Sequence, residues 1–262
     1  MSYYPSPGRR RTAVRPSPVF LLVLAITIGS GIWAWQAGNS GAKGDRAVAF
    51  VFVIAAWVVS LSLHEFAHAF SAWRFGDHEV EARGYLTLNP LKYTHPVLSL
   101  LLPILFIAAG GIGLPGGAVY LHPHRFRTSA QRMIVSLAGP AMNLLSAVVA
   151  FAVGHAVDRS QNLLFFYALM FLALLQVSAT ILNLLPIPGL DGYGAIEPYL
   201  KPETQRALEQ VKPYGMLALF VLLWQVPTVN EYFFRVVYWF FELSGIDRFY
   251  AEYGSLVIRF WK

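Results

Sequence analysis

The sequence predicts an all-α polytopic membrane protein, and three observations support this fold class. The chain of 262 residues is 56% hydrophobic and only 13% charged, with a mean hydropathy of +0.51. Apolar runs of bilayer-spanning length recur along it, and no polar stretch is long enough to fold as a separate soluble domain. We therefore expect a core of three transmembrane helices plus an N-terminal helix, with a small membrane-surface β element and a re-entrant segment.

The chain begins with a basic segment that two apolar runs follow. Residues 1–18 are rich in Pro, Ser and Arg and should form a disordered tail, which its four arginines place in the cytoplasm. The run over 19–37 is long for a signal peptide and lacks a clear cleavage site, so we expect an uncleaved first transmembrane helix. The run over 47–73 then forms a second helix that returns to the cytoplasmic side.

The pattern changes after the second helix. Residues 78–89 alternate in polarity and carry charge, which predicts one or two short strands near the membrane surface, and residues 117–121 could add another. The apolar run over 97–113 is barely long enough to cross and is interrupted by Pro103 and Gly110. We expect a re-entrant segment there, because it keeps the arginines that follow on the cytoplasmic side.

Two further spans complete the core. The runs over 133–157 and 162–185 are long enough to cross the membrane in opposite directions. Together with the preceding segments they define a membrane-embedded core over 19–200. Residues 201–262 should form amphipathic and hydrophobic helices, the first of them a polar interfacial helix over 201–212, and a final crossing in this region is left open.

The second apolar helix carries the pattern His-Glu-Phe-Ala-His at positions 64 to 68. Residues four apart share one face of a helix, so His64 and His68 can bind one zinc ion. Glu65 lies beside that face, where a carboxylate can accept a proton from a zinc-bound water. Such groups are costly inside a membrane helix and therefore indicate function. Since the chain has no cysteine, a further ligand must be His, Asp, Glu or Asn.

Asp191 is the best candidate for a third ligand. The fourth span ends in Asn-Leu-Leu-Pro-Ile-Pro-Gly-Leu-Asp-Gly over 183–192, where the prolines and glycines must end or unwind the helix. The expected topology brings this segment to the same side as His64 and His68. Asn183 could supply an amide N–H to a developing oxyanion. Structural roles remain open: core histidines, a helix cap for Asp191 and helix packing for Asn183.

Three motifs together resemble those of the site-2 protease family of intramembrane zinc metalloproteases. They are the His-Glu-Phe-Ala-His motif, Gly-Pro-Ala-Met-Asn over 139–143 and the segment over 183–192. The resemblance covers roughly residues 47–195 and is to compact bacterial members, without a PDZ or CBS module. It implies an endopeptidase that cleaves transmembrane segments of other membrane proteins, in regulated intramembrane proteolysis.

The resemblance also implies roles for individual residues. It implies that His64, His68 and Asp191 bind one zinc ion per chain and that Glu65 is the catalytic base. It further implies that Asn183 helps to bind substrate or stabilises the oxyanion. The expected partners are transmembrane protein substrates and the lipid bilayer, for a multi-pass protein of the cell membrane with its N-terminus in the cytoplasm.

Two other functions remain open. One is a non-hydrolytic zinc-dependent membrane sensor or transporter, and the other is a catalytically silent scaffold that binds membrane helices; the presence of Glu65 favours the enzyme. For the enzyme, we expect an unwound substrate to pair with an exposed strand edge over 84–88. The net charge of +6 has no basic-aromatic motif behind it, so nucleic acid is not expected as a partner. A homo-oligomer is compatible with the sequence.

Overall fold

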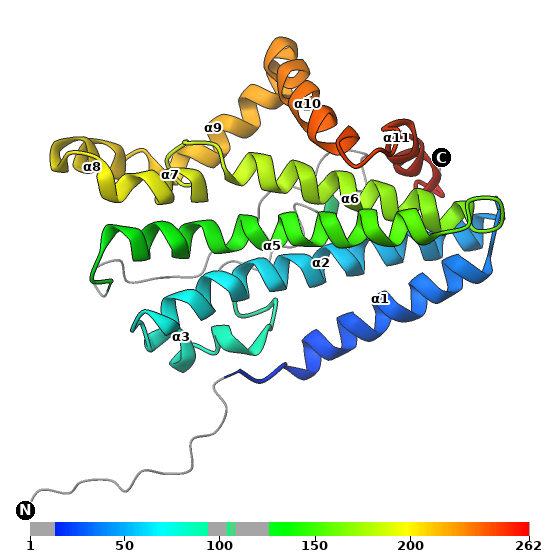
Figure 1. The fold of residues 1–262 in the computed structure, drawn as a ribbon, viewed down its shortest axis with the longest axis horizontal. Coiled ribbons are helices and arrows are strands. Elements are labelled where there is room, and N and C mark those ends of the chain that lie inside the picture. Colours follow the sequence, from blue (N-terminus) through cyan, green and yellow to red (C-terminus); the bar gives the residue numbers. More distant parts are fainter. Residues whose placement is uncertain (1–13, 94–103, 106, 108–125, 262) are drawn as a thin grey trace, which may run out of the picture.

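A computed structural model of the chain describes residues 14–93, 104–105, 107 and 126–261 (Figure 1). The elements of these residues are helical throughout, and the described part of the chain contains no strand. They are α1 (Pro18–Gln36), α2 (Lys43–Arg74), α3 (Glu79–Ala82), η1 (Tyr85–Thr87), α5 (Ser129–Ala156), α6 (Leu163–Asn183), α7 (Asp191–Ile196), η4 (Glu197–Tyr199), α8 (Pro202–Glu209), α9 (Lys212–Gln225), α10 (Pro227–Glu242) and α11 (Phe249–Val257).

Four helices, α1, α2, α5 and α6, are long and apolar enough to cross a membrane. They coincide with the four spans expected from hydropathy, so the prediction of an all-α protein with several apolar helices is confirmed. Side-chain caps fix the starts of two of them. The hydroxyl of Ser17 accepts a hydrogen bond from the Phe20 amide at 3.1 Å ahead of α1, and the hydroxyl of Thr128 accepts one from the Gln131 amide at 3.2 Å ahead of α5.

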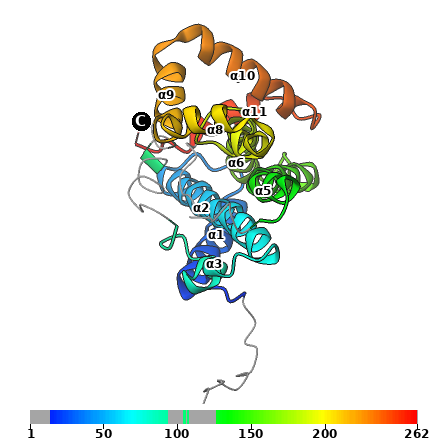
Figure 2. The same ribbon diagram turned by 90° about the vertical axis from the view of Figure 1, so that its left-hand side faces the viewer.

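Helix α6 is the centre of the bundle. In the apolar stretch of each helix that is long enough to span a membrane, 78% of α6 is buried, against 22% of α1 at the periphery. Helices α2 and α5 pack against each other and against α6, while α1 lies along α2 and α11 lies along α6. Figure 2 shows this arrangement from one end of the bundle, with α9 and α10 on the α6 side and α1 and α3 on the opposite side. The core is therefore built where α2, α5 and α6 meet.

Helices α9 and α10 form a bent pair at the C-terminal side of the bundle. The two pass the length and hydropathy test for one span together, with a bend of 100° between them. In Figure 1 α9 begins at the end of the bundle that holds α7 and α8, and α10 leads to α11 at the opposite end. The pair therefore leads from the side of α7 to that of α11, with its bend pointing away from the bundle.

The prediction of strands over residues 78–89 is wrong, because this stretch forms α3 and η1. Local interactions favour the helical turns: Arg83 pairs with Glu79 one turn earlier, with Nη2 2.6 Å from Oε1. Gly84 at φ 77° and Leu88 at φ 57° adopt left-handed backbone conformations, which interrupt an extended chain. The charges that were interpreted as strand alternation thus belong to a helical turn.

The strand edge expected to receive substrate over 84–88 is not formed either. Within this stretch the carbonyls of Leu86 and Thr87 accept hydrogen bonds from the chain's own Arg15 and Ser17 amides, at 3.3 and 2.8 Å. The re-entrant segment over 97–113 lies outside the described residues, apart from 104–105 and 107, which are helical, and so does the strand over 117–121. Of the disordered tail expected over 1–18, residues 14–18 are described; Arg15 and Ser17 make the hydrogen bonds above and Pro18 begins α1.

Candidate metal centre

Three side chains from two distant parts of the sequence meet inside the bundle. His64 and His68 lie one turn apart on α2, and Asp191 is the first residue of α7. The Nε2 atoms of the two histidines are 3.1 Å apart. Each lies 3.4 Å from a different carboxylate oxygen of Asp191. This confirms the expected convergence of α2 with the segment after α6.

The donor set fits a zinc ion in type and in spacing. Two imidazole nitrogens and a carboxylate are common zinc ligands, and ligands bound at about 2.0–2.1 Å in tetrahedral geometry lie about 3.3–3.4 Å apart. The 3.1 Å between the two Nε2 atoms is close to that value. Each Nε2 lies 3.4 Å from a different oxygen of Asp191, and one ligand atom from each of the three residues lies within 4.8 Å of the others. Among the described residues, His64, His68 and Asp191 form the one group of three or more His, Asp or Glu side chains whose ligand atoms are close enough together to hold a metal ion.

Gly139 of α5 leaves space in front of the two histidines. A Cβ atom at this position would lie 2.2 Å from Nε2 of His68 and 2.6 Å from both Nε2 and Cε1 of His64. A side chain there would collide with the same nitrogen atoms that face Asp191. The absence of a side chain at residue 139 is therefore needed to keep the proposed ligand atoms accessible.

The second ring nitrogen of His68 has a fixed partner. Its Nδ1 lies 2.7 Å from the backbone carbonyl oxygen of Val135 on α5. If Nδ1 donates to that carbonyl, Nε2 carries no proton and is free to bind a metal, which is the usual arrangement around a metal-binding histidine. Helix α5 thus sets the orientation of His68 through Val135 and leaves space beside it through Gly139.

Backbone geometry brings Asp191 to the cluster. Gly189 has φ 97°, which favours glycine, and a Cβ at Gly192 would lie 2.2 Å from the carbonyl oxygen of Leu184. The segment after α6 therefore folds back tightly on the end of that helix. Burial opposes ionisation of the Asp191 carboxyl, but the adjacent His68 and His64 side chains hold its pKa below the usual value of an aspartate.

The other two expected site residues are buried near the same end of the bundle. Glu65 follows His64 on α2 and is 3% exposed, and Asn183 is the last residue of α6 and is also buried. Their catalytic roles stay predictions, because burial alone does not show what they do.

Sequence reasoning missed two contributors to this site. The carbonyl of Val135 carries no side-chain signal, and Gly139 enters the sequence analysis only as the first residue of the motif over 139–143, with no role at the metal site. Another buried residue near the site is Tyr93. Its hydroxyl donates a hydrogen bond, 3.3 Å long, to the backbone carbonyl of Ser62, two residues before His64 on α2. Burial, with a smaller contribution from Glu65, raises the pKa of the Tyr93 phenol well above its usual value, so it stays protonated.

Comparison with known proteins gives several relatives, some of which match almost the whole chain. The chain is 56% identical over 251 residues to "Putative zinc metalloprotease Rip2" of Mycolicibacterium smegmatis, covering 96% of each chain. The protein of the same name from Mycobacterium tuberculosis is 54% identical over 252 residues, again with 96% of each covered. "Putative zinc metalloprotease YwhC" of Bacillus subtilis is 31% identical over 182 residues, 65% of this chain and 79% of the relative. No family model and no solved structure matches.

Proposed function

Since the chain belongs to the site-2 protease family of zinc metalloproteases, we propose that it is an intramembrane endopeptidase that hydrolyses peptide bonds within transmembrane segments of other membrane proteins. The observation that carries this proposal is the cluster of His64, His68 and Asp191, whose ligand atoms all lie within 4.8 Å of one another. In this proposal the three side chains hold one zinc ion per chain.

The residues of the chain would divide the chemistry among them. A zinc ion held by three protein ligands supplies an activated water and polarises the peptide carbonyl. Glu65 accepts the proton of that water and transfers it to the departing amine, for which its position next to His64 suits it. Asn183 donates its amide N–H to the oxyanion that develops on the substrate carbonyl. Val135 keeps the His68 ring in the orientation that ligation requires.

The position of the cluster supports a substrate within the membrane. His64 lies ten residues before the last residue of α2, about 15 Å along the helix axis, and α2 is a candidate membrane span. Both histidines are buried within this candidate span, which supports a reaction below the membrane surface. The arginines of residues 1–18 support an N-terminus in the cytoplasm, with the cluster near the cytoplasmic face of the cell membrane. Release of a cytoplasmic fragment in regulated intramembrane proteolysis is the context we propose.

The experiment that tests the proposal compares wild type with Glu65→Gln. Each purified protein is mixed in detergent with a panel of tagged single-span membrane proteins, cleavage is followed by gel, and bound zinc is measured. We expect wild type to cut at least one substrate and Glu65→Gln to cut none while it retains zinc, because the amide cannot accept the proton. Equal cleavage by both forms would reject Glu65 as the base. If the two forms hold zinc and neither cuts, the result favours the zinc-dependent sensor or transporter over the protease.

A further inference from the structure

The helix that carries Asp191 is too short to hold its own position. Helix α7 has six residues, and no side chain caps its first turn. Isolated helices of this length are unstable in water, so their conformation depends on what packs against them. The geometry of the proposed third ligand is therefore set by the neighbours of α7.

One neighbour of the Asp191 segment is the first turn of α9. A Cβ at Gly215 would lie 1.7 Å from the carbonyl oxygen of Pro188, and a Cβ at Gly189 would lie 2.5 Å from the carbonyl oxygen of Lys212. The backbones of the two segments are therefore in direct contact at both glycines. The bent pair α9 and α10 thus begins on the loop that leads to Asp191.

Lys212 adds a contact to α7 itself. Its Nζ lies 2.6 Å from Oε1 of Glu197, the residue that directly follows α7 and begins η4, and 2.7 Å from Oε2 of Glu209. The same ammonium lies 5.7 Å from the ring centre of Tyr193, which is buried within α7. The side chains of Lys212 and Glu197 are only 28% and 22% exposed, so their attraction is less weakened by water than that of a surface pair.

We propose that Lys212 is a positioning residue for Asp191. It joins α9 to the end of α7, and α7 in turn holds the carboxylate in front of His64 and His68. This inference rests on the proposed function only in taking Asp191 as a metal ligand. It makes the region after residue 200 part of the machinery that shapes the metal centre, whereas the sequence motifs end before it.

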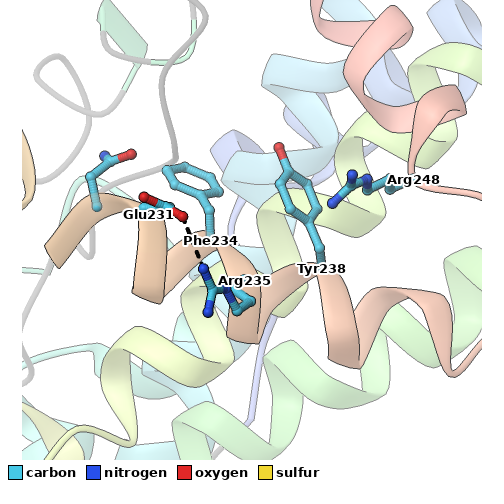
Figure 3. Close-up of a pocket in the computed structure, with 6 residues that line it drawn as sticks. Glu231, Phe234, Arg235, Tyr238 and Arg248 are labelled. Carbon is cyan, nitrogen blue, oxygen red and sulfur yellow. Dashed lines mark hydrogen bonds and ion pairs between the residues drawn. The ribbon is translucent and has the colours of Figure 1, made fainter. Parts of the chain in front are cut away.

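The same bent pair offers a matched control. On α10, Nη2 of Arg235 lies 2.9 Å from Oε1 of Glu231, and these side chains are 63% and 71% exposed (Figure 3). Figure 3 shows this pair beside Tyr238 and Arg248. Together with Asn230 and Phe234, these residues line a pocket of about 540 Å³. Removing Arg235 deletes a cation and one ion pair, whereas removing Lys212 deletes a cation and two, and Arg235 lies on α10 away from the contact with Glu197.

The test is hydrogen exchange of the full-length protein in detergent, metal-free and zinc-loaded, for wild type, Lys212→Met, Lys212→Arg and Arg235→Met. We expect the amides over 187–197 of metal-free Lys212→Met to exchange about tenfold faster than in wild type, because α7 opens locally. The spans α2 and α5 should keep their protection. Lys212→Arg should keep most of the wild-type protection over 187–197, since arginine can contact both carboxylates. Arg235→Met should match wild type over the same residues.

Zinc affinity gives a second readout. Lys212→Met should bind zinc about tenfold more weakly, as loss of a group that orients a ligand does. The double variant Lys212→Met with Glu197→Gln should be little worse than Lys212→Met alone, because the two residues act through one contact. Unchanged exchange over 187–197 in Lys212→Met would overturn the inference, as would an equal effect of Arg235→Met. A wild type that binds no zinc would refute the proposed function instead, and the exchange data would still decide the role of Lys212.

Discussion

Helix α5 has two glycines at which a side chain would strike its neighbours, and the two sites differ in what lies opposite. At Gly139 the nearest atoms are the ring atoms of His68 and His64, at 2.2 and 2.6 Å from a Cβ. At Gly154, toward the other end of the helix, the nearest atom is Cε of Met170, at 2.6 Å. Both positions permit close packing of α5, but only the first opens onto the proposed ligand atoms.

The difference lies in whether the neighbour can move. Met170 ends in a flexible thioether that adapts to a new methyl group by changing rotamer. His68 is held by the carbonyl of Val135 at 2.7 Å and cannot turn away without losing that contact. A small residue in a membrane helix thus serves packing at one end of α5 and keeps a polar site accessible at the other.

Gly139→Ala should give the largest effect. We expect zinc affinity to fall by up to about 100-fold, the upper end of the range known for disturbed metal sites, since the methyl group would displace the His68 imidazole and with it the ligand atom Nε2. Overpacking should also cost about 1–3 kcal/mol of unfolding free energy. Zinc titration and denaturant unfolding in detergent measure the two quantities. Zinc binding equal to wild type would show that residue 139 does not border the metal.

The same substitution in a His68→Ala background sharpens the comparison. With the His68 imidazole absent, the alanine at residue 139 still meets His64, 2.6 Å from its Cβ, but no longer the closer His68 ring, so its unfolding cost should fall by about 1 kcal/mol. The four proteins of this double-mutant cycle are compared by their unfolding free energies. An undiminished cost would mean that Gly139 is required for the approach of the helices rather than for space around His68.

Gly154→Ala is the matched change at the other end of α5. We expect a loss of about 1 kcal/mol of unfolding free energy, because only the end of Met170 must move. Zinc affinity should equal that of wild type. A fall in zinc affinity comparable to that of Gly139→Ala would break the distinction between the two glycines.

Ser60→Ala should have the smallest effect of the set. The Ser60 hydroxyl donates to Oε1 of Gln176 at 2.5 Å, a polar contact between α2 and α6 one turn before His64. Hydrogen bonds between membrane helices contribute about 0.6 kcal/mol on average, so stability should change by about that amount. Unchanged zinc content would show that a buried polar group on α2 close to the histidines can be purely structural.

Much of the fold could be predicted because its physical origin is local. The four spans follow from apolar runs of sufficient length, and the shared face of His64 and His68 follows from helical periodicity. Asp191 could be placed with them because the chain reverses direction at each span, which brings the end of α6 to the histidine end of α2.

The remaining features depend on contacts that composition does not encode. Residues 78–89 resemble strands in their alternation, but the Glu79–Arg83 pair and the left-handed residues Gly84 and Leu88 favour helical turns. The contact of Val135 with His68 uses a backbone atom, which every residue possesses. The contact of Lys212 with Glu197 joins two residues whose proximity depends on the fold of the segment between them.

The central claim is that His64, His68 and Asp191 hold the catalytic zinc ion. The most direct test is the zinc content of protein purified in detergent, measured by mass spectrometry for wild type, Glu65→Gln and His68→Ala. We expect about one zinc per chain in wild type and Glu65→Gln and almost none in His68→Ala, because a catalytic zinc needs three protein ligands. A His68→Ala protein with as much zinc as wild type would contradict the account.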